Sequence, residues 1–290
     1  MRLRALPNML PEPPQTAYNR VMKQVIFTAD DFGLCTEVNE AVERAHTGGV
    51  LSAASLMVAA PAALDAIARA KRLPSLKVGL HLTLVDGRPL LPPSEIPSLV
   101  DARGLFSADL VAAGMRWFFS PAARRDLKKE IRAQFEAFRD TGLALDHVNA
   151  HNHMHLHPTV LGMIIDLTSA FGVTAVRLPA EPPQPGLALW LALMRRRLRA
   201  AGLRHNDVLV GLAHSGHITE ARVLSALDRL QPGVSEFYFH PATASTPALE
   251  ANAPGYDRLG ELHALTSRPV AHRLKALGLT PSGFSDLKPS

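Results

Sequence analysis

The chain has 290 residues, of which 47% are hydrophobic and 20% charged. This composition is typical of a globular protein with a sizeable core, and it excludes disorder of the whole chain. The net charge of +5 is not concentrated in a long basic run, so nucleic acid is not an expected partner. The single cysteine, Cys35, excludes an internal disulfide and favours a reducing, cytoplasmic location, and we expect its thiol to be buried.

The first residues of the chain have no continuous apolar segment and contain four prolines, at positions 7, 11, 13 and 14. They do not have the pattern of a secretory signal. No stretch of the chain approaches the ~20 apolar residues that a membrane-spanning helix needs. We therefore expect residues 1–21 to be a disordered N-terminal extension and residues 22–290 to form one domain.

Strands and helices are predicted to alternate along the domain. In chain order the pattern predicts strand 23–29, helix 36–47 capped by Thr36, strand 50–59, helix 63–72, strand 76–84, helix 122–142, strand 144–150, helix 158–171, strand 174–179, helix 186–201, strand 207–213, helix 218–230, strand 234–240 and a helix pair over 257–278. The proline-containing stretch 85–120 is predicted to be irregular, and loops of that length are often functional lids.

This alternation predicts parallel strands joined by right-handed crossovers. About seven strands at this spacing indicate an α/β fold with a single (β/α) barrel, distorted or incomplete. An open, doubly wound sheet is the alternative. In both folds the chemistry lies at the C-terminal ends of the strands.

Polar residues of unusual type lie at those ends, either in the last residues of a predicted strand or just after it. They are Asp30, Asp31, His81, His151, His153, His155, Arg177, His214, His217 and His240. Because the carboxyl ends of parallel strands lie at one edge of the sheet, we expect these side chains to converge.

Such a mixture of residues is typical of a metal-dependent hydrolase. A catalytic divalent cation takes about three His or Asp ligands and leaves one position for water, whose pKa it lowers. A neighbouring carboxylate can take the proton of that water. Asp30 and Asp31 are adjacent, so one can be a ligand and the other the base if a tight turn at 30–33 brings both to the site. His151 and His155 can share one side of either a helix or an extended segment.

Each of these residues, taken alone, also has a structural interpretation. The Asp30–Asp31 pair can cap a helix, and His81 can be a core histidine. Arg177 can simply pair with a carboxylate, and His214 and His217 can be ordinary loop residues. The dense histidine group after strand 144–150 is the feature that such interpretations explain least well.

Several segments together resemble the YdjC family of carbohydrate deacetylases. They are TADDFG (28–33), VGLHLTL (78–84), DHVNAHNHMHLHP (146–158), VRLP (176–179) and HPA (240–242), in the order of the family. The resemblance implies that Asp30 is the base and that Asp31, His81 and His151 bind the metal. The chain departs from the family at Asn149, Ala150 and Asn152, where Asp, Ser and His are frequent.

The remaining roles follow from the same mechanism. Arg177 is expected to help stabilise the oxyanion, and His240 to protonate the leaving amine, with His153 or His155 as the next candidates. His214 and His217 are expected to contact substrate or support the ligands. An Asp-His-His set suits Zn²⁺, whereas Mg²⁺ prefers more oxygen ligands, and both cofactors are considered.

Segments 211–219 and 235–242 resemble one branch of the family, the hopanoid-biosynthesis-associated deacetylases (HpnK type). That resemblance implies removal of acetyl from an N-acetylglucosaminyl group on a hopanoid glycolipid. The alternatives are soluble N-acetylated substrates such as chitooligosaccharides, or a non-catalytic metal- or sugar-binding protein. Segment 187–202, with Trp190 and four arginines, fits either a peripheral contact at the inner membrane or a core helix with a solvated basic end.

Overall fold

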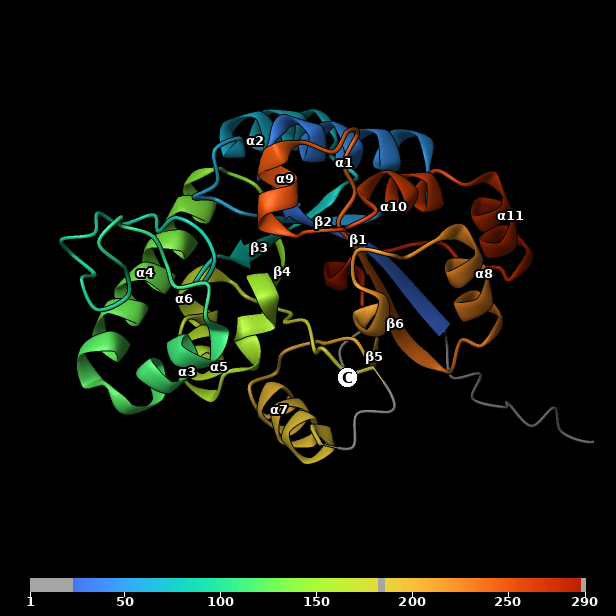
Figure 1. The fold of residues 1–290 in the computed structure, drawn as a ribbon. Helices are drawn as coiled ribbons and strands as arrows, with labels where there is room; N and C mark the ends of the chain where they lie inside the picture. Colours follow the sequence, from blue (N-terminus) through green and yellow to red (C-terminus); the bar gives the residue numbers. More distant parts are fainter. Residues whose placement is uncertain (1–22, 182–185, 288–290) are drawn as a thin grey trace, which may run out of the picture.

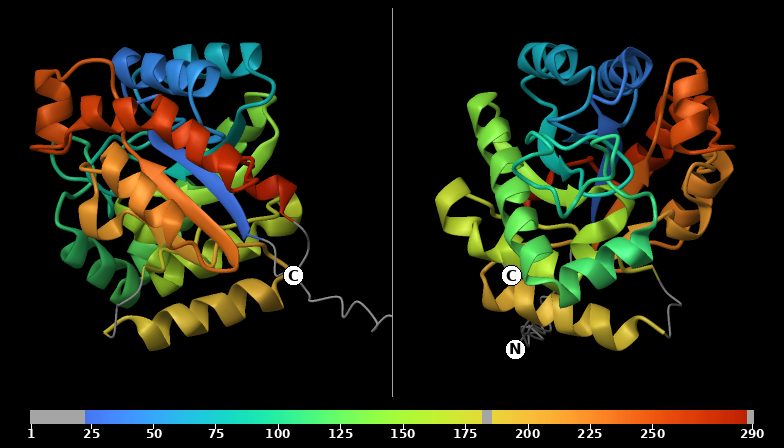
Figure 2. Two further views of the ribbon diagram at one scale, coloured as in Figure 1. Left: turned by 90° about the vertical axis from the view of Figure 1, so that its right-hand side faces the viewer. Right: turned by 60° about the vertical axis from the view of Figure 1, so that its left-hand side comes forward.

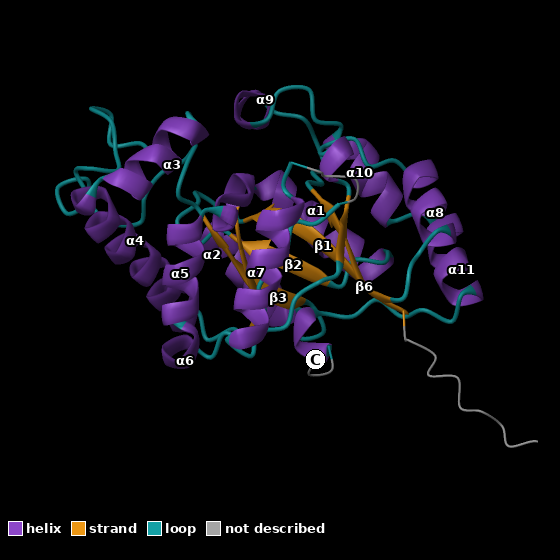
Figure 3. Cartoon of the chain, turned by 90° about the horizontal axis from the view of Figure 1, so that it is seen from below, coloured by secondary structure: helices purple, strands orange, loops and turns teal. Residues whose placement is uncertain are grey.

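The computed structural model describes residues 23–181 and 186–287, so the predicted extension 1–21 lies outside the described residues. Six parallel strands form one sheet in the order β4-β3-β2-β1-β6-β5. The strands are β1 (Lys23–Phe32), β2 (Ala53–Leu56), β3 (Lys77–Leu82), β4 (Leu145–Ala150), β5 (Val208–Val210) and β6 (Gly233–Phe239). Helices surround the curled sheet in every view (Figures 1, 2 and 3).

Segment 174–180 connects the two edge strands of this sheet. The amide of Val148 in β4 donates to the carbonyl of Ala175 at 3.0 Å, and the amide of Leu209 in β5 donates to the carbonyl of Ala180 at 2.7 Å. Backbone hydrogen bonding therefore passes from β4 through this segment to β5. The sheet curls into a distorted (β/α) barrel instead of lying open, which confirms the predicted fold class.

Seven strands were predicted, and the prediction of a regular strand at 174–179, the fifth in chain order, was wrong. The segment makes only isolated bridges, Val148 with Val176 and Ala175 with Arg204. The reason is a contact with a side chain from further along the chain. The Asn206 side chain accepts from the amide of Leu178 at 2.7 Å and donates to its carbonyl at 2.8 Å, where a neighbouring strand would have paired. Pro179, which follows, has no N–H to donate.

The helices lie outside the sheet and follow the predicted order. They are α1 (Thr36–Gly48), α2 (Ala63–Arg72), α3 (Leu110–Phe119), α4 (Pro121–Asp140), α5 (Pro158–Asp166), α6 (Thr168–Phe171), α7 (Ala188–Ala200), α8 (Glu220–Asp228), α9 (Pro247–Asn252), α10 (Arg258–Leu265) and α11 (Arg268–Ala276), with short 3-10 turns η1 (His151–Leu156), η2 (Leu212–His214) and η3 (Phe284–Asp286). Predicted helix 158–171 is divided into α5 and α6.

Two helices were not predicted, and two local details differ. Helix α3 lies in the stretch predicted to be irregular. Its sequence LVAAGMRWFF is mostly apolar, so few polar residues mark its exposed face. Helix α9 is too short for a periodic signal. Cys35, not Thr36, occupies the N-cap position of α1 without a side-chain cap, and its thiol is half-buried rather than buried.

The barrel interior has an apolar floor and polar layers above it. Ile26, Ala53 and Ala175 pack with Phe284 and Leu287, which lie at the amino-terminal ends of the strands. Above this floor, side chains of non-neighbouring strands touch across the interior. Ser55 of β2 contacts His147 of β4 in this way, and Asn149 of β4 contacts Asp30 of β1, so the interior leads upward into a polar site.

Candidate active site

Asp30 and Asp31 reach the same cavity because strand β1 contains a bulge. Ala29 pairs with Ala54 and Phe32 with Leu56, so β1 has one more residue than β2 over this interval. Asp31 has a left-handed backbone with φ 62. Successive side chains of a regular strand point to opposite faces, and the bulge cancels that alternation. At the predicted tight turn, 30–33, the structure therefore has a bulge inside a strand that continues to Phe32, and a turn follows in which the amide of Leu34 donates to the carbonyl of Asp31 at 2.9 Å.

Asp31, His81 and His151 form a buried group suited to a metal ion. Each residue offers one ligand atom, and these atoms all lie within 4.8 Å of one another. The Asp31 Oδ1 atom lies 3.5 Å from His81 Nε2 and 3.1 Å from His151 Nδ1. The three residues come from β1, β3 and the start of η1, as the strand-end argument predicted.

Two ligand atoms of this group have no hydrogen-bond partner in the structure. Among the described side chains, Asp31 Oδ2 and His81 Nε2 are buried atoms without a hydrogen bond, and the nearest cation to Asp31 Oδ2 is the guanidinium of Arg258, at an ion-pair distance of 3.8 Å. Buried polar atoms are nearly always satisfied, so converging lone pairs of this kind need an explanation. A divalent cation with Asp and His ligands provides one, and the residues present therefore fit the predicted metal.

Asn149 orients His81 from behind. The Asn149 Oδ1 atom lies 2.7 Å from His81 Nδ1, and the Asn149 amide nitrogen donates to Asp30 Oδ1 at 3.1 Å. The carbonyl therefore accepts the Nδ1 proton of His81, which leaves the Nε2 lone pair facing Asp31. Supporting hydrogen bonds of this kind fix the tautomer of metal-binding histidines.

Arg177 pairs with two buried carboxylates, Asp30 and Glu236. Its Nη1 and Nη2 atoms donate to Asp30, while its Nε and Nη2 atoms donate to Glu236. Burial by itself would raise the pKa of the Asp30 carboxyl, but the positive charge of Arg177 lowers that pKa well below its usual range. Asp30 is therefore an ionised carboxylate beside the ligand group, and the donors of Arg177 are committed to carboxylates.

His240 and His153 line the same cavity, of about 190 Å³, as Asp30 and the ligand group. The ring of Tyr238 lies edge-on between them, 5.3 Å from His240 and 5.4 Å from His153. Burial lowers the pKa of His240 to about 4 and that of His153 to about 3. Both imidazoles are consequently neutral at pH 7.

The histidine group after β4 adopts neither of the two geometries considered from sequence. In η1, Asn152 and His153 have left-handed backbones, with φ 51 and 53. This kink lets His151 and His153 line one cavity, while His155 lies beneath it and accepts a hydrogen bond from the amide of Ala150 at 3.0 Å. Residues with such backbones cluster at functional sites.

His214 and His217 lie away from this cavity. Both are exposed, and His214 instead borders a separate pocket of about 590 Å³ between β5 and α8. His217 packs loosely on the ring of Tyr256, whose centroid is 6.3 Å away. Tyr256 lines the active-site cavity, so His217 reaches the site only through it.

Sequence reasoning missed several residues of the site. They are Asn149 as the support of His81, Glu236, Tyr238, Tyr256, Arg258 and Glu261. Glu236 had a detectable signal, because it is a lone acid inside an apolar strand. Glu261 and Arg258 had none: α10 carries them, and Glu261 accepts the amide N–H groups of His240 and Ile218 from far along the chain.

The fold and this group define a class, namely (β/α)-barrel proteins with a buried Asp-His-His group, of a kind suited to a metal ion, at the carboxyl ends of their strands. Within that class the chain belongs to the YdjC-like protein family, whose model matches residues 24–276. The resemblance seen in the sequence motifs is thereby confirmed at the level of the family.

Three relatives show how far the similarity extends. A carbohydrate deacetylase of Mus musculus is 32% identical over 308 aligned residues, covering 93% of this chain and 96% of the relative. One of Geobacillus stearothermophilus is 32% identical over 255, covering 88% and 94%. A crystal structure from Enterococcus faecalis V583, described in terms of cellobiose-phosphate cleavage, has a TM-score of 0.76 at 26% identity, covering 90% of this chain and 97% of that one.

Proposed function

We propose that this protein is a divalent-metal-dependent carbohydrate N-deacetylase. One observation carries the proposal: the unpaired, buried ligand atoms of Asp31 and His81 converge beside the ionised carboxylate of Asp30 in a single cavity. A protein that only binds metal or sugar needs no such carboxylate. The family and the carbohydrate deacetylases among its relatives support the same function.

In the proposed mechanism Asp31, His81 and His151 hold the cation. When bound, the cation supplies Lewis-acid polarisation of the acetamide carbonyl and lowers the pKa of water. Asp30 accepts a proton from the attacking water. Arg177 acts through Asp30, because their ion pair keeps the Asp30 carboxylate ionised. In this role Arg177 needs no direct contact with the oxyanion.

The leaving amine also needs a proton, and His240 remains our candidate donor. Because its pKa of about 4 makes it neutral at pH 7, it can donate only a proton that it gains during the reaction. The proton first taken by Asp30 is such a source. His240 is held for this role by Glu261, which accepts its backbone N–H. His153, on the opposite side of Tyr238, is the second candidate.

The test is acetate release from N-acetylglucosaminyl substrates with and without a chelator. We expect release that chelation abolishes and that Zn²⁺ or Mg²⁺ restores, and the more effective ion identifies the cofactor. Unchanged release in the chelated protein would contradict the metal's role. Absence of release from every N-acetylated sugar tested, in protein shown to contain metal, would contradict the deacetylase itself.

Replacing a ligand should remove the metal before it affects the fold. We expect His81→Ala to weaken Zn²⁺ binding in isothermal titration by at least about 100-fold, since it deletes one of three ligands. His214→Ala, a histidine outside the cavity, is the matched control and should bind Zn²⁺ like the wild type. Equal affinities of the two variants would place the metal elsewhere.

For the substrate we propose an N-acetylglucosaminyl group on a hopanoid glycolipid, and soluble chitooligosaccharides are the competing class. Support for the lipid-linked substrate comes from segments 211–219 and 235–242 and from the surface described next. Comparing kcat/KM for acetate release from both classes decides between them. A higher value for chitooligosaccharides would reject the glycolipid.

Helices α3 and α7 carry the exposed apolar surface that fits contact with a membrane. On α3 the exposed fractions are 76% for Val111, 54% for Met115 and 67% for Phe119, and on α7 Leu189 is 86% exposed. Both helices pack beside residues 156–157, and Figures 1 and 2 show them on the same side of the molecule. Exposed arginines accompany them, at positions 116, 196 and 199.

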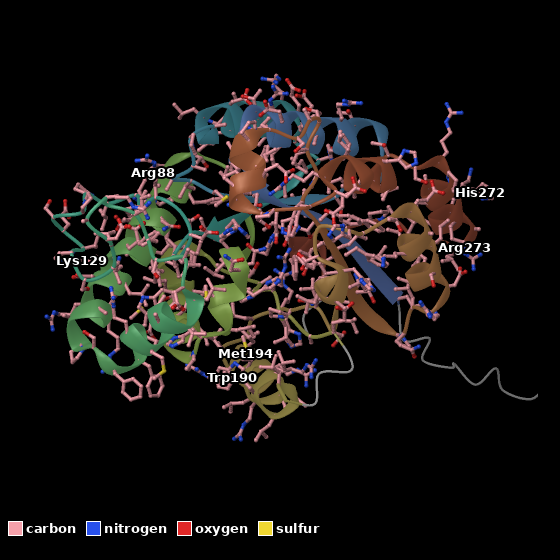
Figure 4. All side chains as sticks on the ribbon, in the orientation of Figure 1. Arg88, Lys129, Trp190, Met194, His272 and Arg273 are labelled. Atoms are coloured by element: carbon pink, nitrogen blue, oxygen red, sulfur yellow. The ribbon has the colours of Figure 1, made fainter. Side chains whose placement is uncertain are left out.

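Trp190 is not part of this exposed surface. Its indole N–H donates to the carbonyl of Leu156 at 2.9 Å, and Met194, on the same side of α7, is fully buried (Figure 4). One side of α7 therefore packs on the domain, as the core-helix interpretation holds, while Leu189 and Leu193 face solvent. No helix in the described ranges is both long and apolar enough to cross a bilayer, so the contact we propose is peripheral, with an anionic lipid surface.

A paired substitution tests this membrane contact. We expect the wild type to co-sediment with vesicles containing anionic phosphatidylglycerol, and the variant Phe118→Ser/Phe119→Ser to lose most of that binding. Leu64→Ser is the control, because Leu64 is an apolar residue on the distant helix α2 and is even more exposed, at 84%, than Phe118 and Phe119, at 52% and 67%. If the wild type does not bind, or if the control loses as much binding as the α3 variant, the surface has another role.

A further inference from the structure

A chain of buried polar side chains runs from the metal ligand His81 down the barrel interior. Asn149 contacts Ser55, whose Oγ lies 2.9 Å from the Asn149 amide nitrogen and 3.0 Å from His147 Nε2. His147 Nδ1 then lies 2.8 Å from Asp146 Oδ2. All four side chains below His81 are at most 2% exposed. Of these four, only Asn149 was given a role above, as the residue that orients His81.

The hydrogen atoms of this chain can be placed by counting donors and acceptors. Asn149 donates one amide hydrogen to Asp30 and the other to Ser55. Ser55 must therefore pass its own hydrogen to His147 Nε2, because a protonated Nε2 would leave the hydroxyl hydrogen without an acceptor. His147 consequently carries its proton on Nδ1 and donates it to Asp146. At the upper end, the Asn149 carbonyl accepts the Nδ1 proton of His81.

The lower end of the chain is anchored to the floor of the barrel. Asp146 also accepts the amide N–H groups of Phe284 and Ser285, at 3.1 and 2.8 Å. The Phe284 ring lies 4.8 Å from the His147 ring. Opposite it, a Cβ on Gly79 would lie 2.4 Å from His147 Cε1, so only glycine leaves room for the imidazole there. His147 is thus confined on two sides.

These three residues have the order of a Ser-His-Asp triad, but they do not form a nucleophilic site. Ser55 is fully buried, and its oxygen already accepts a hydrogen bond from Asn149. A substrate carbonyl therefore has no access to the hydroxyl. The arrangement orients other groups instead of attacking one.

We propose that Ser55, His147 and Asp146 are positioning residues, which hold the Asn149 amide in one orientation and thereby fix the tautomer of His81. The amide has two orientations that differ by exchange of oxygen and nitrogen. Only the observed one gives His81 a proton on Nδ1 and a free Nε2 lone pair for a cation. It also directs an N–H at Asp30, so the same chain orients the base. The inference rests on the metal site of the proposed function.

The first test uses the wild type without metal. Nitrogen-15 NMR of the histidine rings at pH 7 is expected to show both His81 and His147 protonated on Nδ1 with unprotonated Nε2. Neither result requires activity or metal. An Nε2-protonated tautomer for either ring would overturn the hydrogen-bond order given above.

The second test removes the link at Ser55. In Ser55→Ala the amide loses one of its two acceptors, so only its hydrogen bond to Asp30 still opposes a turn of the N–H₂ group toward His81. We expect His81 to shift toward the Nε2-protonated tautomer, Zn²⁺ affinity to fall about 10–100-fold as for other supports of metal ligands, and kcat to fall with little change in KM. Ser55→Cys, which keeps a weak acceptor of similar shape, should recover part of the affinity.

Ser52→Ala is the matched control. Ser52 lies just before β2 and is also buried, and among the described residues its hydroxyl forms hydrogen bonds only with the backbone of Phe27. It should lose comparable stability but retain wild-type Zn²⁺ affinity and the His81 tautomer. Equal Zn²⁺ affinity in Ser55→Ala and Ser52→Ala would overturn the positioning role. Failure of the wild type to bind Zn²⁺ or Mg²⁺, or to release acetate, would instead overturn the proposed function. The NMR measurement of the His81 and His147 tautomers would still test the hydrogen-bond order in that case.

Discussion

Asp30→Asn is expected to lower kcat for acetate release by about 10²–10⁴-fold, the range that a general base contributes. Asn has the same shape as Asp but accepts no proton from water at neutral pH. The metal ligands are unchanged, so Zn²⁺ affinity should stay within a few-fold of the wild type. Initial rates of acetate release and Zn²⁺ titrations on the same preparations provide the measurement.

Asp31→Asn is the matched comparison, since it alters the neighbouring carboxylate in the same bulge. We expect that variant to lose Zn²⁺ binding along with activity, because Asp31 is the ligand whose Oδ2 has no other hydrogen-bond partner. The two variants therefore separate the base from the ligand. Full activity in Asp30→Asn would remove Asp30 from the mechanism, and loss of metal there would exchange the two roles.

Arg177→Met is expected to destabilise the fold by about 3–5 kcal/mol, the cost of breaking a buried ion pair by removing one partner. Asp30 and Glu236 would both remain, buried and without the guanidinium that pairs with them. Met has a similar length and an apolar end, so the loss reflects the uncompensated carboxylates more than a cavity. The midpoint and slope of urea unfolding measure the change.

A surface pair supplies the control for this experiment. Arg273 pairs with Asp228 at 2.7 Å, but both side chains are largely exposed, and Figure 4 shows Arg273 at the edge of the molecule. Exposed pairs contribute about 0–1 kcal/mol, so Arg273→Met should unfold close to the wild type. If Arg177→Met were equally mild, the buried carboxylates would have found other partners, and the argument for the ionised state of Asp30 would fail.

The sequence predicted the site best where the positions of the strand ends and the family motifs indicated the same residues. Asp31, His81 and His151 lie at or near the ends of three separate predicted strands, and parallel topology requires that these ends meet at one edge of the sheet. Their roles as ligands remain predictions, but their proximity is now an observation. The alternation of strands and helices was sufficient for a parallel α/β fold, because each segment carries its own hydrophobic periodicity. The choice of the barrel over the open sheet rests on the backbone contacts of segment 174–180 in the structure.

What could not be predicted depends on contacts between distant segments. No local pattern in β1 indicates that Asp31 is the extra residue of a bulge. Asn206 replaces a strand partner for Leu178 only because the two meet in three dimensions. Ser55 and His147 looked like ordinary strand residues, since their hydrogen bond joins positions 92 residues apart.

The left-handed backbone of Asp31 also restricts which residues this position can accept. At φ 62 most side chains would crowd the following carbonyl, at a cost of about 1–2 kcal/mol, whereas Gly, Asn and Asp adopt this conformation most readily. Gly offers no ligand and Asn no negative charge. The backbone conformation and the need for a charged ligand thus both favour Asp at position 31. Glu and His are good metal ligands elsewhere, but the backbone alone would disfavour them here.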